Sequence, residues 1–129
     1  LFSELNNENI KNASVIIVDN IGTLSKLYKY ASLAYIGGGF NGEGKLHNTL
    51  EAAVFGLPII IGKYYSKFPE AVNMIKSGGM FSINNAESLK NKIDELIRDK
   101  EKLQQTGALN SSFINSKIGA TQSILTNLK

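Results

Sequence analysis

The stretch "AYIGGGFNGEGKLHNTLEAAVFGLPIII", residues 34–61, decides the fold class of this chain. An apolar run leads into five glycines between residues 37 and 44, and a helical segment is predicted from Asn48 to Gly56. Pro58 then opens a second apolar run. Glycine loses more backbone entropy on folding than any other residue, so this concentration indicates a loop whose backbone geometry matters. Strand, loop, helix and strand in this order are typical of a βαβ unit with parallel strands.

The same alternation extends along the chain on both sides of this stretch. Short apolar runs predict four strands, at 14–19, 33–37, 58–62 and 80–83. The first of them, "SVIIVD", is β-branched and apolar at successive positions, which is typical of a strand buried on both faces.

Helices are predicted between and after these strands. The first covers residues 24–31, and the second starts at Pro69, a residue suited to a first helical turn. The last two cover 86–99 and 101–129, the latter with breaks expected near Gly107 and Gly119. The sequence therefore predicts an α/β fold, a Rossmann-like parallel sheet flanked by helices.

Composition and charge exclude several classes of protein. The chain has 129 residues, 43% of them hydrophobic, and its net charge of +3 comes from charges spread along the sequence. That bias is too weak to indicate a nucleic-acid partner. There is no cysteine, hence no disulfide or thiolate metal site. No apolar run approaches the ~20 residues of a membrane span, so we expect a soluble segment that needs other parts of a protein to reach a membrane.

The start of the chain is polar, "LFSELNNENIKN", and the first predicted strand begins only after it. Four parallel strands make a thin sheet for a domain of this type. We therefore expect residues 1–129 to be part of a domain whose first strands lie upstream of residue 1.

Ligands of open parallel sheets bind at the carboxyl ends of the strands, where the glycine loop is predicted to lie. One interpretation is a dinucleotide fingerprint, because Gly37, Gly39 and Gly42 satisfy G-x-G-x-x-G. That motif also requires a ribose-binding acid about 20 residues further on, and after the next strand no acid occurs until Glu70.

A second interpretation is a P-loop, because residues 39–45 satisfy G-x-x-x-x-G-K. The next residue should be Ser or Thr to hold magnesium, and it is Leu46. Residues 39–45 therefore match the P-loop pattern in letters but lack the residue that would hold magnesium.

A third interpretation rests on the residues after the glycines. Asn48 and Glu51 have the spacing of a capping box, which by itself favours a purely structural role in starting a helix. The same helix start presents unpaired N–H groups that suit a phosphate, and a carboxylate one turn in can accept hydrogen bonds from a ribose diol. His47, the only histidine, flanks this place.

The run "YIGGGF…GEGKLHNTLEAAVFGLPIIIG" resembles the donor-binding segment of the 3-deoxy-D-manno-octulosonic acid (Kdo) transferases. That family has two glycines after a strand, then Gly-x-His-Asn-x-Leu-Glu, then Gly-x-Pro before an apolar strand. Here these features are Gly37-Gly38, residues 47–51 and residues 56–58. "VDNIGTLSKLYKYASLAYIGG", "KFPEAVNMI" and "GATQSIL" are similar to flanking parts of the family, so the resemblance covers residues 14–129.

The resemblance implies the C-terminal, nucleotide-sugar-binding half of a GT-B fold. It implies transfer of Kdo from CMP-Kdo to a lipid A precursor, by an inverting reaction at the cytoplasmic face of the bacterial inner membrane. No cofactor and no metal are expected. The general base is expected in an N-terminal domain, so no catalytic residue is expected in this segment, which should bind donor and be inactive alone.

The resemblance also implies roles for individual residues. Glu51 should accept from the ribose hydroxyls, and Asn48 and Thr49 should hold the phosphate or the Kdo carboxylate. His47 should orient the loop or contact the sugar acid. Further candidates are three glycines that let the backbone approach the donor, residues that frame the cytosine, and an acid after the next strand: Gly37, Gly38, Gly39, Asn20, Ile21, Gly22 and Glu70.

Two alternatives stay open on the sequence. A GT-B glycosyltransferase that uses a UDP- or GDP-sugar also needs a glutamate for the ribose. A non-catalytic α/β domain needs the glycines only to turn the chain. Nucleotide binding separates these from the first interpretation.

Overall fold

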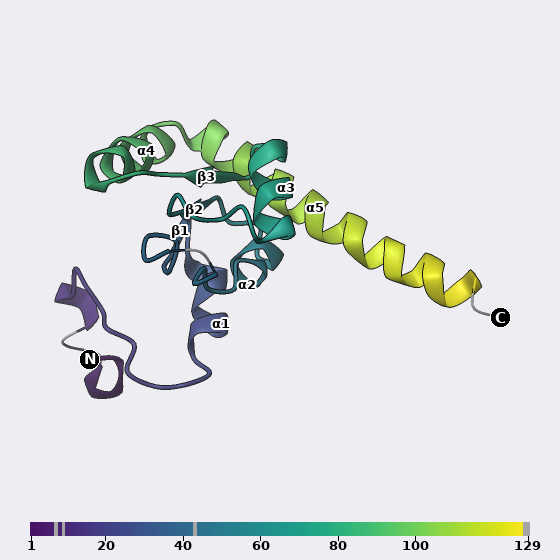
Figure 1. Cartoon of the computed structure of the whole chain (residues 1–129). Helices are drawn as coiled ribbons and strands as arrows, with labels where there is room; N and C mark the ends of the chain where they lie inside the picture. The colour runs from purple at the N-terminus through teal and green to yellow at the C-terminus, as the bar shows by residue number, and fades with distance from the viewer. Residues whose placement is uncertain (7, 9, 43, 128–129) are drawn as a thin grey trace.

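The computed structural model describes residues 1–6, 8, 10–42 and 44–127, and the surroundings of side chains up to residue 118. Its sheet has three parallel strands in the order β1-β2-β3: β1 (Ala34–Ile36), β2 (Ile59–Ile61) and β3 (Met80–Ser82). The helices are α1 (Leu24–Leu27), α2 (Leu50–Val54), α3 (Pro69–Ser77), α4 (Ala86–Arg98) and α5 (Lys100–Asn127) (Figure 1). Short 3₁₀ helices occur at Phe2–Glu4, Ile10–Asn12 and Tyr28–Tyr30. The α/β prediction is confirmed.

The central strand β2 is covered on both faces. All three of its isoleucines are fully buried, Ile59 and Ile61 in one core cluster and Ile60 in another. The first cluster includes side chains of α2, α3 and α5, and the second includes side chains of α4. Apolar residues at successive positions of a strand fit this environment, because alternate side chains point to opposite faces.

Local sequence signals position the longer helices. Pro69 occupies the first turn of α3, as predicted. Asn85 caps α4: its side chain accepts from the Ser88 N–H at 2.8 Å, and the Ser88 hydroxyl accepts from the Asn85 N–H at 3.1 Å. This reciprocal pair satisfies two N–H groups that an uncapped helix start leaves unpaired.

The predicted strand at 14–19 is wrong for this structure. These residues are extended but belong to no sheet, and Figure 1 shows them in a loop that stands away from the body before it returns to α1. Val15 is 80% exposed and Ile17 63% exposed. A strand needs a hydrogen-bonded neighbour, and in the described residues the sheet has no strand beyond β1.

The predicted breaks in the last helix are also wrong. The backbone of α5 continues through Gly107 and Gly119 to Asn127. Gly107 is buried where α5 crosses the end of α2, and a Cβ atom there would lie 2.0 Å from the Gly56 carbonyl oxygen. The glycine therefore permits close approach of two segments and does not interrupt the helix.

One buried amide joins α5 to the sheet. The Asn110 side chain is fully buried, and its Nδ2 atom donates to the carbonyls of Leu57 and Gly79, each at 2.7 Å. These carbonyls lie just before β2 and β3, so one side chain ties both strand starts to the helix. Its Oδ1 atom has no hydrogen-bond partner among the described residues.

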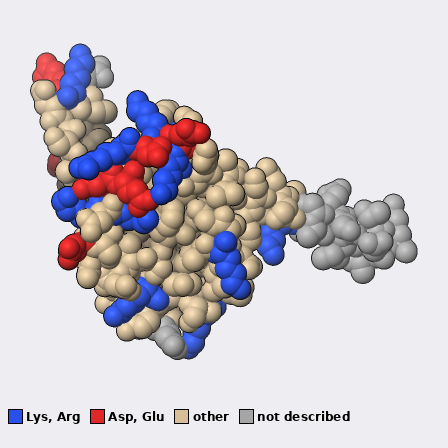
Figure 2. Space-filling model, turned by 90° about the horizontal axis from the view of Figure 1, so that it is seen from above, with Lys and Arg blue, Asp and Glu red and all other residues tan. Residues whose placement is uncertain are grey.

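The charged surface is mixed in sign. Figure 2 shows acidic and basic side chains gathered over α4 and the start of α5. Glu95 is paired with both Lys92 and Lys102, and these contacts lower its pKa to about 2. Paired charges of both signs do not form the basic stripe that nucleic acids require.

Within the described part of the chain, no helix has the length and apolarity of a membrane span.

Replacing Asn110 with alanine is expected to lower the free energy of unfolding by about 1–3 kcal/mol, because the Leu57 carbonyl loses its donor and the Gly79 carbonyl keeps only the Ile59 N–H. Urea denaturation of the variant measures this. Gln104→Ala is the matched control, since Gln104 is an exposed amide on the same helix. A loss no larger than that of the control would contradict the structural role given to Asn110.

Candidate functional site

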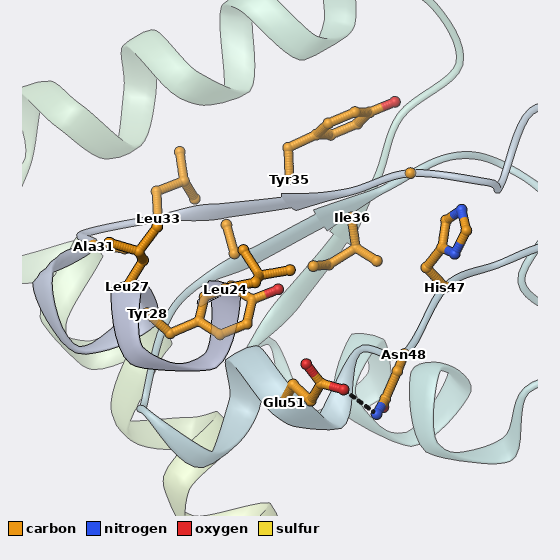
Figure 3. Close-up of a pocket in the computed structure, with 12 residues that line it drawn as sticks. Leu24, Leu27, Tyr28, Ala31, Leu33, Tyr35, Ile36, His47, Asn48 and Glu51 are labelled. Atoms are coloured by element: carbon orange, nitrogen blue, oxygen red, sulfur yellow. Dashed lines mark hydrogen bonds between the residues drawn. The ribbon is translucent and has the colours of Figure 1, made fainter. Parts of the chain in front are cut away.

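A cavity of about 570 Å³ lies along β1, from Leu33 before the strand to Gly37 at its carboxyl end. One wall is apolar and comes from α1 and β1, and the other carries Gly37, His47, Asn48 and Glu51 (Figure 3). Four of the predicted site residues are therefore brought together. Gly37 directly follows β1, so these four residues lie at the carboxyl-end edge of the parallel sheet, where ligands of α/β proteins bind.

The glycine loop folds back on the next strand. Gly38 has a φ of 95°, and a Cβ atom on it would lie 1.7 Å from the Lys45 carbonyl oxygen. A Cβ on Gly39 would meet the Gly62 backbone at 3.0 Å, and the Gly39 carbonyl accepts from the Tyr64 N–H at 2.9 Å. The structure thus gives Gly38 and Gly39 a packing role. Only Gly37 of the three predicted glycines lines the cavity.

The start of α2 differs from the predicted capping box. Asn48 Oδ1 accepts from the Leu50 N–H at 3.0 Å, and Asn48 Nδ2 donates to Glu51 Oε1 at 3.1 Å. Glu51 therefore binds the Asn48 side chain where the box would have it bind the Asn48 backbone. The helix begins at Leu50 with Thr49 at its N-cap position, one residue later than a helix with Asn48 at the N-cap would begin. The result is a carboxylate held toward the cavity (Figure 3).

Tyr28 is a residue of this site that the sequence analysis did not single out, since it lies within the helix predicted over residues 24–31. It is 8% exposed, lines the cavity and packs against Phe55, with 6.0 Å between the ring centroids. Burial raises the pKa of its phenol, and the negative charge of Glu51 raises this pKa further. The phenol therefore stays protonated and can act as a donor beside the carboxylate. The sequence pattern alone could not separate this tyrosine from Leu24 and Leu27, the apolar residues that precede it in the same helical segment.

His47 and Thr49 lie on the two sides of Asn48, but in different environments. His47 is exposed on the cavity wall, and its N–H donates to the Gly37 carbonyl at 3.2 Å. Thr49 is only 3% exposed and is not among the residues that line the cavity. The structure therefore brings His47 to the site and leaves Thr49 behind it, in the core.

The remaining candidates lie elsewhere. Asn20, Ile21 and Gly22 belong to the loop before α1 and do not line the cavity. Glu70, in the first turn of α3, lines a separate cavity of about 440 Å³ between α3 and α5. The structure does not bring these four residues to Glu51.

The arrangement suits a ligand with an apolar, flat part and a polyhydroxy part. A carboxylate has about four acceptor positions, and the described residues give Glu51 one hydrogen-bond partner, Asn48. The phenol of Tyr28 and the exposed imidazole of His47 add hydrogen-bonding groups on either side. No group of three or more His, Cys, Asp or Glu with metal-binding geometry occurs in the described part of the chain.

Comparison with known proteins assigns the family. The model of "Glycosyl transferases group 1" matches residues 2–110. The chain belongs to this family. Of the relatives of this glycosyl transferase segment, the 3-deoxy-D-manno-octulosonic acid transferase of Haemophilus influenzae is 33% identical over 129 residues, which are 98% of this chain and 29% of the relative. The enzyme of that name from Aquifex aeolicus is 35% identical over 98 residues, which are 75% of this chain and 27% of the relative.

The fold comparison agrees with the family assignment. The C-terminal CMP-Kdo binding domain of WaaA from Acinetobacter baumannii superimposes with a TM-score of 0.67 over 75% of this chain and 51% of that one, at 23% identity. The segment thus has the fold of the C-terminal half of a GT-B enzyme. It spans less than a third of the two relatives named above.

Replacing Gly38 with alanine is expected to destabilise this segment, because the new Cβ would collide with the Lys45 carbonyl. Gly44→Ala is the matched control: Gly44 has a φ of 90°, but no atom lies within 4 Å of the added Cβ. An alanine in the left-handed region costs about 1–2 kcal/mol in either case. Thermal unfolding should therefore show a clearly larger loss for Gly38→Ala, and equal losses would contradict the packing role of Gly38.

Proposed function

We propose that this chain is the donor-binding segment of a Kdo transferase, and that its ligand is CMP-Kdo. The observation that carries the proposal is the position of Glu51, exposed on α2 and directed into the cavity that runs along β1 to Gly37 at its carboxyl end. Gly37 and three residues of the His-Asn-x-Leu-Glu run that resembles the Kdo transferases, His47, Asn48 and Glu51, line this cavity. The similarity to two transferases of that name supports the choice of sugar.

In this proposal the nucleoside lies along the apolar wall and its ribose hydroxyls donate to Glu51. Tyr28 contributes packing area and a phenol hydrogen bond beside the carboxylate. Asn48 and His47 lie closer to the phosphate and the sugar acid, and Gly37 leaves room for the donor at the strand end. Thr49 supports this helix start from the core through its carbonyl, which accepts from the Ala53 N–H.

The whole protein is proposed to transfer Kdo to a lipid A precursor with inversion, at the cytoplasmic face of the inner membrane. The general base and the acceptor site belong in this proposal to an N-terminal domain that docks on this one. This chain by itself is therefore expected to bind donor without transferring the sugar.

The test is ligand-observed NMR with CMP, UMP, GMP and ATP on the chain and on Glu51→Ala. CMP should bind in preference to the other three nucleotides. Loss of a charged hydrogen bond costs about 1.5–3 kcal/mol, so Glu51→Ala should weaken CMP about 10- to 100-fold.

Glu87→Ala provides the matched control, because Glu87 is also an exposed glutamate in the first turn of a helix, on α4. It should leave CMP affinity unchanged. Preference for a uridine or guanosine nucleotide would move the chain to a glycosyltransferase with another donor. Equal losses in the two variants would contradict the role of Glu51.

A further inference from the structure

The Asn48 side chain uses both ends of its amide at the start of α2. Its Oδ1 atom accepts from the Leu50 N–H at 3.0 Å, and its Nδ2 atom donates to Glu51 Oε1 at 3.1 Å. A backbone N–H can only donate, so it fixes the amide oxygen on its own side and leaves the nitrogen facing the carboxylate. The contact between Asn48 and Glu51 therefore follows from the position of the Leu50 backbone.

The backbone that carries Asn48 is anchored on both sides. The His47 N–H donates at 3.2 Å to the carbonyl of Gly37, the residue that follows β1. Thr49 is 3% exposed, and its carbonyl accepts from the Ala53 N–H at 3.2 Å. Asn48 thus lies between a residue tied to the end of the sheet and a residue buried in the core. A side chain on such a backbone can hold a neighbouring side chain in a fixed orientation.

Glu51 is a side chain for which such support matters. It is exposed, and a glutamate loses much rotamer freedom when it is held in one place. Asn48 is its one hydrogen-bond partner among the described residues and contacts only Oε1. The other oxygen is turned away from Asn48 in the cavity that both residues line (Figure 3). A carboxylate that is ordered before the ligand arrives costs the ligand less binding energy.

The same contact disfavours a phosphate at Asn48. A phosphate bound by Nδ2 would lie beside the carboxylate that this nitrogen already contacts, and two anions at such a short separation repel each other. The amide oxygen cannot serve instead, because it is an acceptor and is turned to the Leu50 N–H. The amide of Asn48 therefore suits support of Glu51, although the residue lies on the phosphate side of the cavity in the proposed function.

We infer that Asn48 is a positioning residue, which holds the Glu51 carboxylate toward the ribose and makes no contact with the phosphate. This role rests on the proposed function, which assigns the ribose hydroxyls to Glu51. Asn48 and Glu51 then act as one unit, so the effects of removing them are not additive. The contribution of the pair is also the same for a nucleoside as for its 5′-phosphate.

Ligand-observed NMR with CMP and with cytidine tests this role on the parent chain and on Asn48→Ala. An unsupported Glu51 must be ordered when the ligand binds, so Asn48→Ala should raise the dissociation constant about two- to tenfold. The rise should be equal for the two ligands, because cytidine lacks only the phosphate. In the Glu51→Ala background, Asn48→Ala should change either affinity by less than about twofold.

Asn48→Asp separates the contact with Glu51 from the cap on Leu50. A carboxylate oxygen still accepts from the Leu50 N–H, but the second oxygen replaces the donor that faces Glu51. This variant should melt no lower than Asn48→Ala and still lose at least as much cytidine affinity.

Asn85→Ala is the matched control. Asn85 also caps a helix, since its side chain accepts from the Ser88 N–H at 2.8 Å at the start of α4, and it does not line the cavity. The control should lower the melting temperature and leave both affinities unchanged.

The ribose hydroxyls supply a further measurement, which a general loss of structure would not change. 2′,3′-Dideoxycytidine lacks both hydroxyls that Glu51 is proposed to bind, so the parent chain should prefer cytidine to it. Asn48→Ala should narrow this preference, because it weakens only the ligand that uses the carboxylate.

Three results would overturn the positioning role. A loss of affinity for CMP with none for cytidine would give Asn48 a direct phosphate contact. Equal losses in the parent and Glu51→Ala backgrounds would make the two residues independent. Equal losses for cytidine and dideoxycytidine would reduce Asn48 to a cap of the helix.

The contact can also be measured without a ligand. In a two-dimensional NMR spectrum of the free chain, the Asn48 side-chain amide protons should move upfield in Glu51→Ala, which removes a charged acceptor, and stay in place in Glu87→Ala. If they move but no nucleoside or nucleotide binds, the contact stands, and the proposed function fails together with the role in donor binding. If they stay in place in both variants while CMP binds the parent chain, the positioning role fails and the proposed function stands.

Discussion

The burial of β2 between two helix layers is the constraint on which the rest of the structure depends. Its three isoleucines are fully buried, and one side of the sheet is closed by α2, α3 and α5 while α4 closes the other. A parallel strand in this position fixes its neighbours, since β1 and β3 must pair with it in register. The glycine loop after β1 is then forced against the residue that follows β2, Gly62. The position of the candidate site at this edge follows from that packing.

The elements predicted with success are those whose signals are local or periodic. The three observed strands are short apolar runs between helix signals, and the start of α3 is marked by Pro69. The run at 14–19 has consecutive β-branched apolar residues like those of β2, yet in this structure it has no partner strand among the described residues. Composition indicates what a segment can bury and does not show whether the neighbour is in place. Gly107 was misread for a related reason, because its neighbour, the Gly56 carbonyl, is distant in sequence.

The candidate site was predictable in part. The resemblance identified residues 47–51, and the structure places His47, Asn48 and Glu51 around one cavity. Tyr28 and the packing roles of Gly38 and Gly39 depend on contacts between segments that only the folded chain brings together. The capping-box spacing was real, but Asn48 uses its side chain where the motif would use its backbone. Spacing predicts which groups can meet, and the local backbone decides which atoms do.

The shortness of α2 has a consequence for how variation would affect this protein. A helix of five residues does not hold its shape alone, since isolated helices need about 12–15 residues to be even marginally stable in water. Ala52 and Ala53 are fully buried, and Gly56, two residues after the helix ends, fits against Gly107 of α5. The carboxylate of Glu51 thus takes its orientation from a helix more than fifty positions further along the chain. Random mutagenesis scored by the affinity of the proposed donor would recover changes on the buried face of α5, although no α5 residue lines the cavity.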